Sequence, residues 1–301
     1  MKFGITPLSL EFMINYVIKE QGIEGLSNFR LSEVIEEIAE AGFKHCEITL
    51  DIFQLLPIRV TEEDLERLKE IKRKYNISYS AHFPISSIEL ACPNKFIREA
   101  SIRSIIDAYE SFIHLEDDIE MYILHPTGEF ITDAMNFITD PRISPIVTTV
   151  FTEFAIQSIK EIISNTRIDR NKIAIENIKY PLQETIKIVK ELDTKLCIDT
   201  AHLLGGFSGK YDLLEITEKY FDIIGEIHLQ DYTDEIVNAD HCALGKGKNF
   251  PPEFLNLIYQ KDFKGPIVFE LPRKDIITSI EYIRNNVPQI EVPNIKNLSL
   301  Y

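Results

Sequence analysis

The stretch KIAIENIKYPLQETIKIVKELDTKLCIDTAH, residues 172–202, shows the unit from which the chain is built. Two short apolar runs, Lys172 to Asn177 and Lys195 to Asp199, flank a segment of helical periodicity from Leu182 to Leu192. Each run carries a carboxylate at its end, Glu176 in the first and Asp199 in the second. Apolar runs joined by an amphipathic helix indicate parallel strands, and polar residues at their carboxyl ends indicate a functional site there.

The same unit recurs along the whole chain. The predicted strands are Lys2 to Thr6, Lys44 to Leu50, Ser78 to Phe83, Glu120 to His125, Lys172 to Asn177, Lys195 to Asp199, Ile224 to Gln230 and Pro266 to Leu271. The predicted helices are Ser32 to Ala41, Thr61 to Tyr75, Asn94 to His114, Val147 to Asn165, Leu182 to Leu192, Tyr211 to Tyr220, Pro252 to Tyr259 and Asp275 to Asn285, with Ser32, Thr61 and Asn94 as expected N-caps. No G-x-G-x-x-G turn follows the first strand, so the pattern favours an α/β fold of the closed (β/α)8 TIM barrel type over an open dinucleotide-binding sheet.

Chain length sets the domain organisation. At 301 residues the chain is long enough for one barrel, so we assign residues 1–287 to it and residues 288–301 to an extended C-terminal tail. Two connections are long, Leu8 to Phe29 and Thr127 to Ile146. Loops that follow barrel strands lie over the mouth of the barrel, so we expect both to shape the substrate pocket or to act as lids.

Charge and cysteine content narrow the classes of partner. A net charge of −16 disfavours nucleic acid, because proteins that neutralise phosphates usually present a clustered basic surface. The four cysteines, Cys46, Cys92, Cys197 and Cys242, form no C-x-x-C pair, which fits a reducing compartment. No stretch reaches the roughly 18 apolar residues of a membrane span. We therefore expect a cytoplasmic protein that acts on a small molecule, and the sequence leaves its oligomeric state open.

Four ionisable residues at strand ends predict a metal site. Glu176, Asp199 and Glu270 each interrupt an apolar strand, and an unpaired buried carboxylate costs several kcal/mol unless a cation or hydrogen bonds stabilise it. With His228 they form a set of three oxygen ligands and one nitrogen ligand that suits Mn, Mg, Co or Zn. A single histidine is usually structural, but residues that share one end of several strands are not independent.

Six motifs make the chain recognisable. They are Ala-His-Phe-Pro at 81–84, Leu-His-Pro-Thr-Gly at 124–128, Ile-Glu-Asn at 175–177, Asp-Thr-Ala-His-Leu-Leu at 199–204, His-Leu-Gln-Asp at 228–231 and Leu-Gly-Lys-Gly at 244–247. In this order they resemble the xylose-isomerase-like TIM barrel superfamily. That superfamily joins sugar and sugar-phosphate isomerases and epimerases with the AP endonuclease family 2 phosphodiesterases such as endonuclease IV.

The epimerase pattern implies one divalent ion, Mn, Zn, Co or Mg. It places the ion on Glu176, Asp199, His228 and Glu270. Glu176 and Glu270 then act as catalytic bases on opposite faces of a substrate carbon, while the metal stabilises an enediolate. The resemblance gives His202 the task of holding a substrate hydroxyl or phosphate. Many epimerases carry an arginine after His-x-x-Asp, where this chain has Tyr-Thr-Asp-Glu-Ile.

The endonuclease pattern implies two or three zinc ions. It places a second ion on His82, His125 and a bridging Glu176, and a third on His202, His241 and an aspartate. That aspartate is expected two residues before His241, where this chain has Ala239, so the neighbouring Asp240 is the candidate substitute. Two or three cations that clamp a phosphodiester and activate water would explain the surplus of histidines.

Three functions therefore remain, in order of preference. We favour a metal-dependent isomerase or epimerase of a sugar or sugar phosphate, because the acidic charge disfavours a DNA-repair enzyme. The alternative is a multi-zinc phosphodiesterase acting on nucleic acid or on a cobamide-like diester, since the run at 176–181 also resembles a cobamide-remodelling branch. The third is a degenerate metal-binding barrel, although the four-ligand set is complete.

A second group of residues is expected to contact the substrate. Lys246 is a candidate for an anionic group, and His202 for a hydroxyl or phosphate. Phe83, Tyr180 and Phe207 are candidates for lining a sugar or base pocket, with packing at the barrel rim as the alternative.

Overall fold

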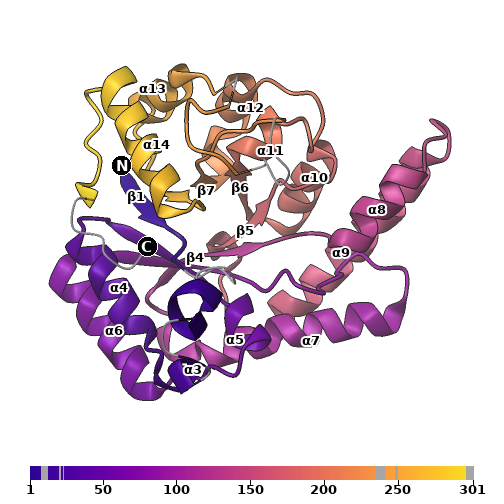
Figure 1. The fold of residues 1–301 in the computed structure, drawn as a ribbon. Helices are drawn as coiled ribbons and strands as arrows, with labels where there is room; N and C mark the ends of the chain where they lie inside the picture. Colours follow the sequence, from indigo (N-terminus) through magenta and orange to yellow (C-terminus); the bar gives the residue numbers. More distant parts are fainter. Residues whose placement is uncertain (8–12, 20–21, 23, 235–240, 248–249, 296–301) are drawn as a thin grey trace.

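The computed structural model is a closed barrel of eight parallel strands surrounded by helices (Figure 1). It describes residues 1–7, 13–19, 22, 24–234, 241–247 and 250–295. The strands are β1 (Lys2–Ile5), β2 (His45–Thr49), β3 (Ser78–His82), β4 (Ile119–Leu124), β5 (Ile173–Glu176), β6 (Lys195–Asp199), β7 (Ile224–His228) and β8 (Pro266–Phe269). Each pairs with its neighbour in sequence, and β8 closes the barrel against β1, so the predicted fold is confirmed.

The helices follow the strands in the predicted order. They are η1 (Met13–Ile18), α3 (Glu24–Asn28), α4 (Leu31–Glu40), α5 (Asp51–Leu55), α6 (Glu62–Tyr75), α7 (Lys95–Ser111), α8 (Glu129–Phe137), α9 (Ser144–Asn165), α10 (Leu182–Leu192), α11 (Thr200–Leu204), α12 (Leu213–Tyr220), α13 (Pro252–Gln260) and α14 (Arg273–Asn286), with single turns η2 (Ile113–Leu115), η3 (Arg170–Lys172) and η4 (Phe221–Ile223). No described helix is long and apolar enough to span a membrane.

Two of the three expected N-caps are confirmed and one is wrong. Thr61 accepts a hydrogen bond from the Asp64 amide, and Asn94 accepts one from the Phe96 amide. Ser32 instead lies inside α4, where its amide donates to Asp64. The Asp64 carboxylate comes from α6 and also accepts from the Leu31 amide. A side chain from a neighbouring helix therefore replaces the local cap at this helix start.

Both long connections contain helical segments. The second forms α8 and the first turn of α9, which project away from the barrel (Figure 1). The first contains η1 and α3, and part of it lies outside the described residues. After α14 the chain packs back on the core through Val287, Ile290 and Ile295, all buried. Residues 296–301 of the expected tail lie outside the described part.

The interior of the barrel is divided into an apolar side and a polar side. Strands β4, β5 and β6 contribute a small apolar cluster of Met121, Ile123, Ala174 and Cys197. Strands β2, β3 and β7 contribute buried polar side chains, which are His45, Glu47, Ser80 and Glu226. Gly4 on β1 makes room for this polar side, because a Cβ there would come within 2.8 Å of the His45 Cβ. The functional residues lie above this interior, at the carboxyl ends of the strands.

Candidate metal centre

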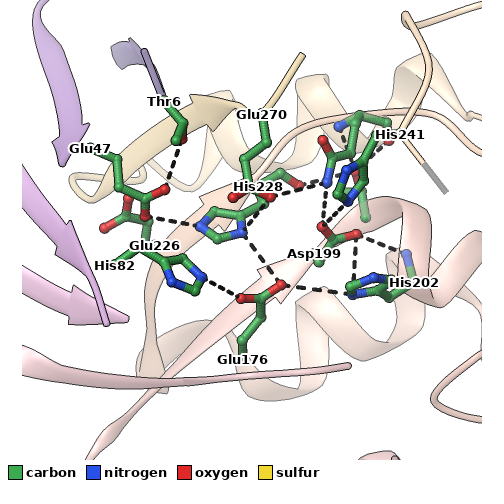
Figure 2. Close-up of polar contacts among 12 residues, drawn as sticks. Thr6, Glu47, His82, Glu176, Asp199, His202, Glu226, His228, His241 and Glu270 are labelled. Carbon is green, nitrogen blue, oxygen red and sulfur yellow. Dashed lines mark hydrogen bonds and ion pairs between the residues drawn. The ribbon is translucent and has the colours of Figure 1, made fainter. Parts of the chain in front are cut away.

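Four strand ends converge on the predicted ligand set (Figure 2). Glu176 ends β5, Asp199 ends β6, His228 ends β7, and Glu270 directly follows β8. Each offers one ligand atom, and these atoms all lie within 4.8 Å of one another. Parallel strands in a barrel end at the same rim, which explains why residues so far apart in sequence meet here.

One potential ligand atom of this set, Nδ1 of His228, lies close to two carboxylates but forms no hydrogen bond with a described residue. His228 Nδ1 lies 3.1 Å from Glu270 Oε2 and 3.5 Å from Glu176 Oε1. Among the described residues it has no hydrogen-bond partner, although the side chain is fully buried. A buried nitrogen between two carboxylates fits a cation ligand, since an uncompensated polar atom at this depth is costly. The residues present therefore fit a divalent metal.

A second group adjoins the first through Glu176. His125 Nε2 lies 2.9 Å from Glu176 Oε2, and His82 Nε2 lies 3.3 Å from the same oxygen. Glu176 thus directs one oxygen toward these two histidines and the other toward His228, and Figure 2 shows its contacts with His82 and His228. The structure brings together all three residues that the endonuclease pattern predicts for a second ion, and Glu176 belongs to both this group and the first.

A third group lies on the other side of Asp199. His202 Nδ1 is 3.7 Å from Asp199 Oδ1, and His241 Nε2 is 3.9 Å from Asp199 Oδ2. Within the described part of the chain, Asp199 is the carboxylate that joins these two histidines in a potential metal group. The predicted ligand Asp240 and its neighbour Ala239 lie outside the described residues.

The electrostatics of the centre couple the carboxylates to the histidines. Burial opposes ionisation of Glu176, yet His125 and His228 hold its pKa well below the ordinary value. Burial likewise opposes ionisation of Glu270, but His228 lowers its pKa to about 2. Burial lowers the pKa of His82, but Glu176 and other carboxylates raise it to about 9. The same negative field that stabilises protons on these imidazoles would stabilise divalent cations, so protons and metal compete.

Hydrogen bonds fix the orientation of three of the rings. His82 Nδ1 lies 2.8 Å from the Phe83 carbonyl oxygen, and His202 Nδ1 lies 2.9 Å from the Asn177 carbonyl oxygen. His228 differs, because its Nε2 lies 3.2 Å from Oε2 of the Glu47 carboxylate. With a cation bound in the centre, the nitrogen of His82 or His228 that faces away from it toward the carbonyl or carboxylate would keep the proton, and the other nitrogen would be the ligand.

A cleft of about 600 Å³ opens beside the second group. Its lining comes from the loops after β3, β4 and β5 and from α8, and it includes His125 and His202. The described charged residues of the lining are Glu129, Asp133 and Lys179, and hydroxyls come from Ser86, Ser87, Thr127 and Thr132. The expectation that the loop from Thr127 to Ile146 shapes a pocket fits this lining.

The residues predicted to contact substrate are dispersed. Phe83 and Tyr180 are each 1% exposed, and Phe83 stacks on Tyr122, while the Tyr180 hydroxyl bonds to the Thr148 carbonyl. Phe207 packs edge-on against His202 at 5.9 Å between ring centroids. Lys246 is exposed and is not among the described residues that line the cleft. Phe207 and His202 are therefore the two that lie beside the metal groups.

Several buried polar residues behind the centre were not predicted from the sequence. Glu47, Glu226 and His45 are all 0% exposed. Gln230 donates from Nε2 to both Asp199 and Glu270. The signal was present in the strand period, since Glu226 precedes His228 by two residues and so shares its face of β7.

The family follows from the chain as a whole. A family model described as xylose isomerase-like TIM barrel matches residues 35–286. The chain belongs to this family. An uncharacterized protein of Methanocaldococcus jannaschii is 25% identical over 268 residues, which cover 84% of each chain.

Solved structures from two kinds of enzyme share the fold. A D-tagatose 3-epimerase-like protein superposes with a TM-score of 0.67 at 21% identity, covering 96% of this chain and 98% of the other. Endonuclease IV from Thermus thermophilus superposes with a TM-score of 0.66 at 14% identity, covering 96% and 100%. At these identities the likeness shows the fold alone.

Proposed function

We propose that the protein is a divalent-metal-dependent phosphodiesterase that uses two or three zinc ions, the second of the functions that the sequence leaves open. The convergence of His82 and His125 on Glu176 Oε2 carries this proposal. A single-metal isomerase needs only the set of Glu176, Asp199, His228 and Glu270. The imidazoles of His82 and His125 would be additional metal ligands in a multinuclear site, where a carboxylate such as that of Glu176 can bridge neighbouring cations.

The protein residues would share the work as follows. His82, His125 and Glu176 would hold one ion, the set around His228 a second, and Asp199 with His202 and His241 a third. When bound, such ions polarise the phosphoryl oxygens and lower the pKa of water. The Glu270 side chain is 19% exposed, more than Glu176 or Asp199, and is ionised at neutral pH because its pKa is lowered to about 2. It would accept a proton from the attacking water.

The cleft points to a compact diester rather than a nucleic acid duplex. Of the charged residues described in its lining, two are acidic and one is basic, Lys179. The chain as a whole carries a net charge of −16. A surface that follows a polyanionic backbone needs clustered lysine and arginine, which this lining does not provide among its described residues.

The isomerase remains the second candidate because its ligand set is complete. Glu176 and Glu270 both lie close to His228 Nδ1. This arrangement would suit an isomerase in which the three side chains bind one cation and the two carboxylates act as bases. The fold is shared with epimerases as well as with endonuclease IV. Complete ligand groups argue against the third candidate, a degenerate barrel.

Metal counting and two assays separate the candidates. Protein purified without chelator should contain at least two zinc ions, with anomalous peaks at the zinc edge separated by less than about 5 Å. It should hydrolyse bis(p-nitrophenyl) phosphate, and His82→Ala should abolish this activity. One metal peak beside Glu270, together with solvent-deuterium exchange into a ketose and no diester hydrolysis, would establish the isomerase instead.

A further inference from the structure

A buried carboxylate lies directly behind the ligand histidine of β7. His228 Nε2 is 3.2 Å from Glu47 Oε2, and both side chains are 0% exposed. The Thr6 hydroxyl donates to the other oxygen, Glu47 Oε1, at 2.8 Å. Figure 2 shows the contact from Thr6 to Glu47 and the contact from Glu47 to His228, with Thr6 and Glu47 on the side of His228 away from Asp199.

We propose that Glu47, itself held by Thr6, is a positioning residue that orients His228 for metal binding. The inference rests on the metal centre of the proposed function, but it applies to either enzyme class because both use His228. An ionised carboxylate can only accept hydrogen bonds, so when a cation occupies the centre the single proton of the His228 imidazole is held on Nε2, which faces Glu47. The lone pair of Nδ1 then faces Glu176 and Glu270, at the distances of 3.5 and 3.1 Å that separate Nδ1 from their oxygens.

His228 is oriented differently from His82, His125 and His241, whose Nε2 atoms face carboxylates of the centre. A backbone carbonyl accepts from Nδ1 of His82, and the Nε2 of that ring faces Glu176. His228 presents Nδ1 and is backed by a charged acceptor. A carboxylate behind a metal-bound imidazole fixes the ring and makes the ligand nitrogen more basic, an effect that a neutral carbonyl gives more weakly.

The barrel fixes this carboxylate in place. Glu47 lies in the middle of β2, where the strand pairs with β1 through Ile5 and Cys46 and with β3 through Ser80. Thr6 follows β1 directly, so its hydroxyl reaches Glu47 from the neighbouring strand. A supporting residue on rigid strands holds a ligand more accurately than one on a loop.

An alternative role for Glu47 is testable in the same experiment. Oxygens of Glu47 and Glu226 and a nitrogen of His228 lie within 4.8 Å of one another. If Glu47 were itself a metal ligand, its removal would lower the number of bound ions. If it positions His228, its removal would lower affinity at unchanged stoichiometry.

The experiment measures zinc binding by competition with a chelating dye in the full chain and in four variants. Relative to wild type, Glu47→Gln keeps an acceptor but loses the charge, and we expect about tenfold weaker zinc binding at the affected site. Glu47→Leu loses both, and we expect about 100-fold weaker binding. Thr6→Val should fall near Glu47→Gln, because it frees one oxygen of the carboxylate. The matched control is Glu226→Gln, which alters a neighbouring buried carboxyl that does not accept from His228 Nε2, and it should stay within about threefold of wild type.

Spectroscopy adds a readout that a purely structural role would not move. In cobalt-loaded protein, Glu47→Gln should shift the visible ligand-field bands, whereas Glu226→Gln should not. Equal zinc affinity in wild type, Glu47→Gln and Thr6→Val would overturn the inference. The inference would also fail if the Glu47 variants bound one zinc ion fewer than wild type, because Glu47 would then be a metal ligand itself. If Glu47→Leu does not fold, the zinc affinities of Glu47→Gln and Thr6→Val still test the inference. If the wild-type protein proves to have no diesterase activity, the proposed function fails, but the zinc affinities still test the role of Glu47. The two proposals can therefore be refuted separately.

Discussion

Replacing His125 by alanine tests the multinuclear centre most directly. In the metal-free protein, His125 Nε2 bonds at 2.9 Å to Glu176, which is 2% exposed. Hydrogen bonds to charged groups contribute about 1.5–3 kcal/mol, so we expect the metal-free variant to lose about that much stability. With zinc at 100 times its dissociation constant, each occupied site adds about 2.7 kcal/mol in wild type. His125→Ala should lose that increment for one site and bind one zinc fewer.

The assay combines metal analysis with thermal unfolding in chelator and in excess zinc. A loss of about 2.7 kcal/mol corresponds to a decrease of about 5 °C in the zinc-dependent part of the melting temperature. His114→Ala is the matched control, because His114 is exposed on η2. An unchanged zinc count in His125→Ala, with the full zinc-dependent stabilisation, would refute the assignment of His82, His125 and Glu176 as a metal group.

Two further predictions concern pH. Because the pKa of His82 is raised to about 9, a metal ion must displace its proton at neutral pH, so zinc affinity should rise between pH 6 and about 9. Isothermal titration calorimetry at several pH values measures this affinity. A zinc affinity that does not change with pH would contradict the prediction. Burial and Glu47 raise the pKa of Glu226 well above the ordinary value. The unfolded chain therefore ionises first, and the fold loses stability as pH rises above about 4.3. Glu226→Gln removes this loss, so in metal-free protein it should raise the melting temperature more at pH 8 than at pH 4, and equal effects at both would count against it.

The strand ends could be predicted from the sequence, whereas the contacts between distant elements could not. Glu176 and Asp199 stand where an apolar run gives way to a polar loop, and barrel topology then dictates that they meet. The cap of α4 could not be found in this way, because its acceptor, Asp64, lies on another helix. Local sequence favours Ser32 as the cap, and only tertiary packing reveals the replacement.

The residues behind the centre show the same limit. The strand period places Glu47 on the face of β2 that also carries His45. It does not reveal that Glu47 meets His228, because β2 and β7 are not neighbours in the barrel. That pairing depends on how far each side chain reaches across the interior, which the sequence of either strand does not specify.

The divided interior of the barrel is consistent with the role proposed for Glu47. An interior filled by apolar residues is the usual way to stabilise such a barrel, and β4 to β6 follow it with Met121, Ile123, Ala174 and Cys197. On the opposite side, Glu47 and Glu226 are fully buried, and an oxygen of Glu226 has no hydrogen-bond partner among the described residues. Buried carboxyl groups of this kind cost stability that apolar residues would not. Of the two, Glu47 faces the metal centre through His228, so its contribution to the orientation of that ligand offsets part of the cost.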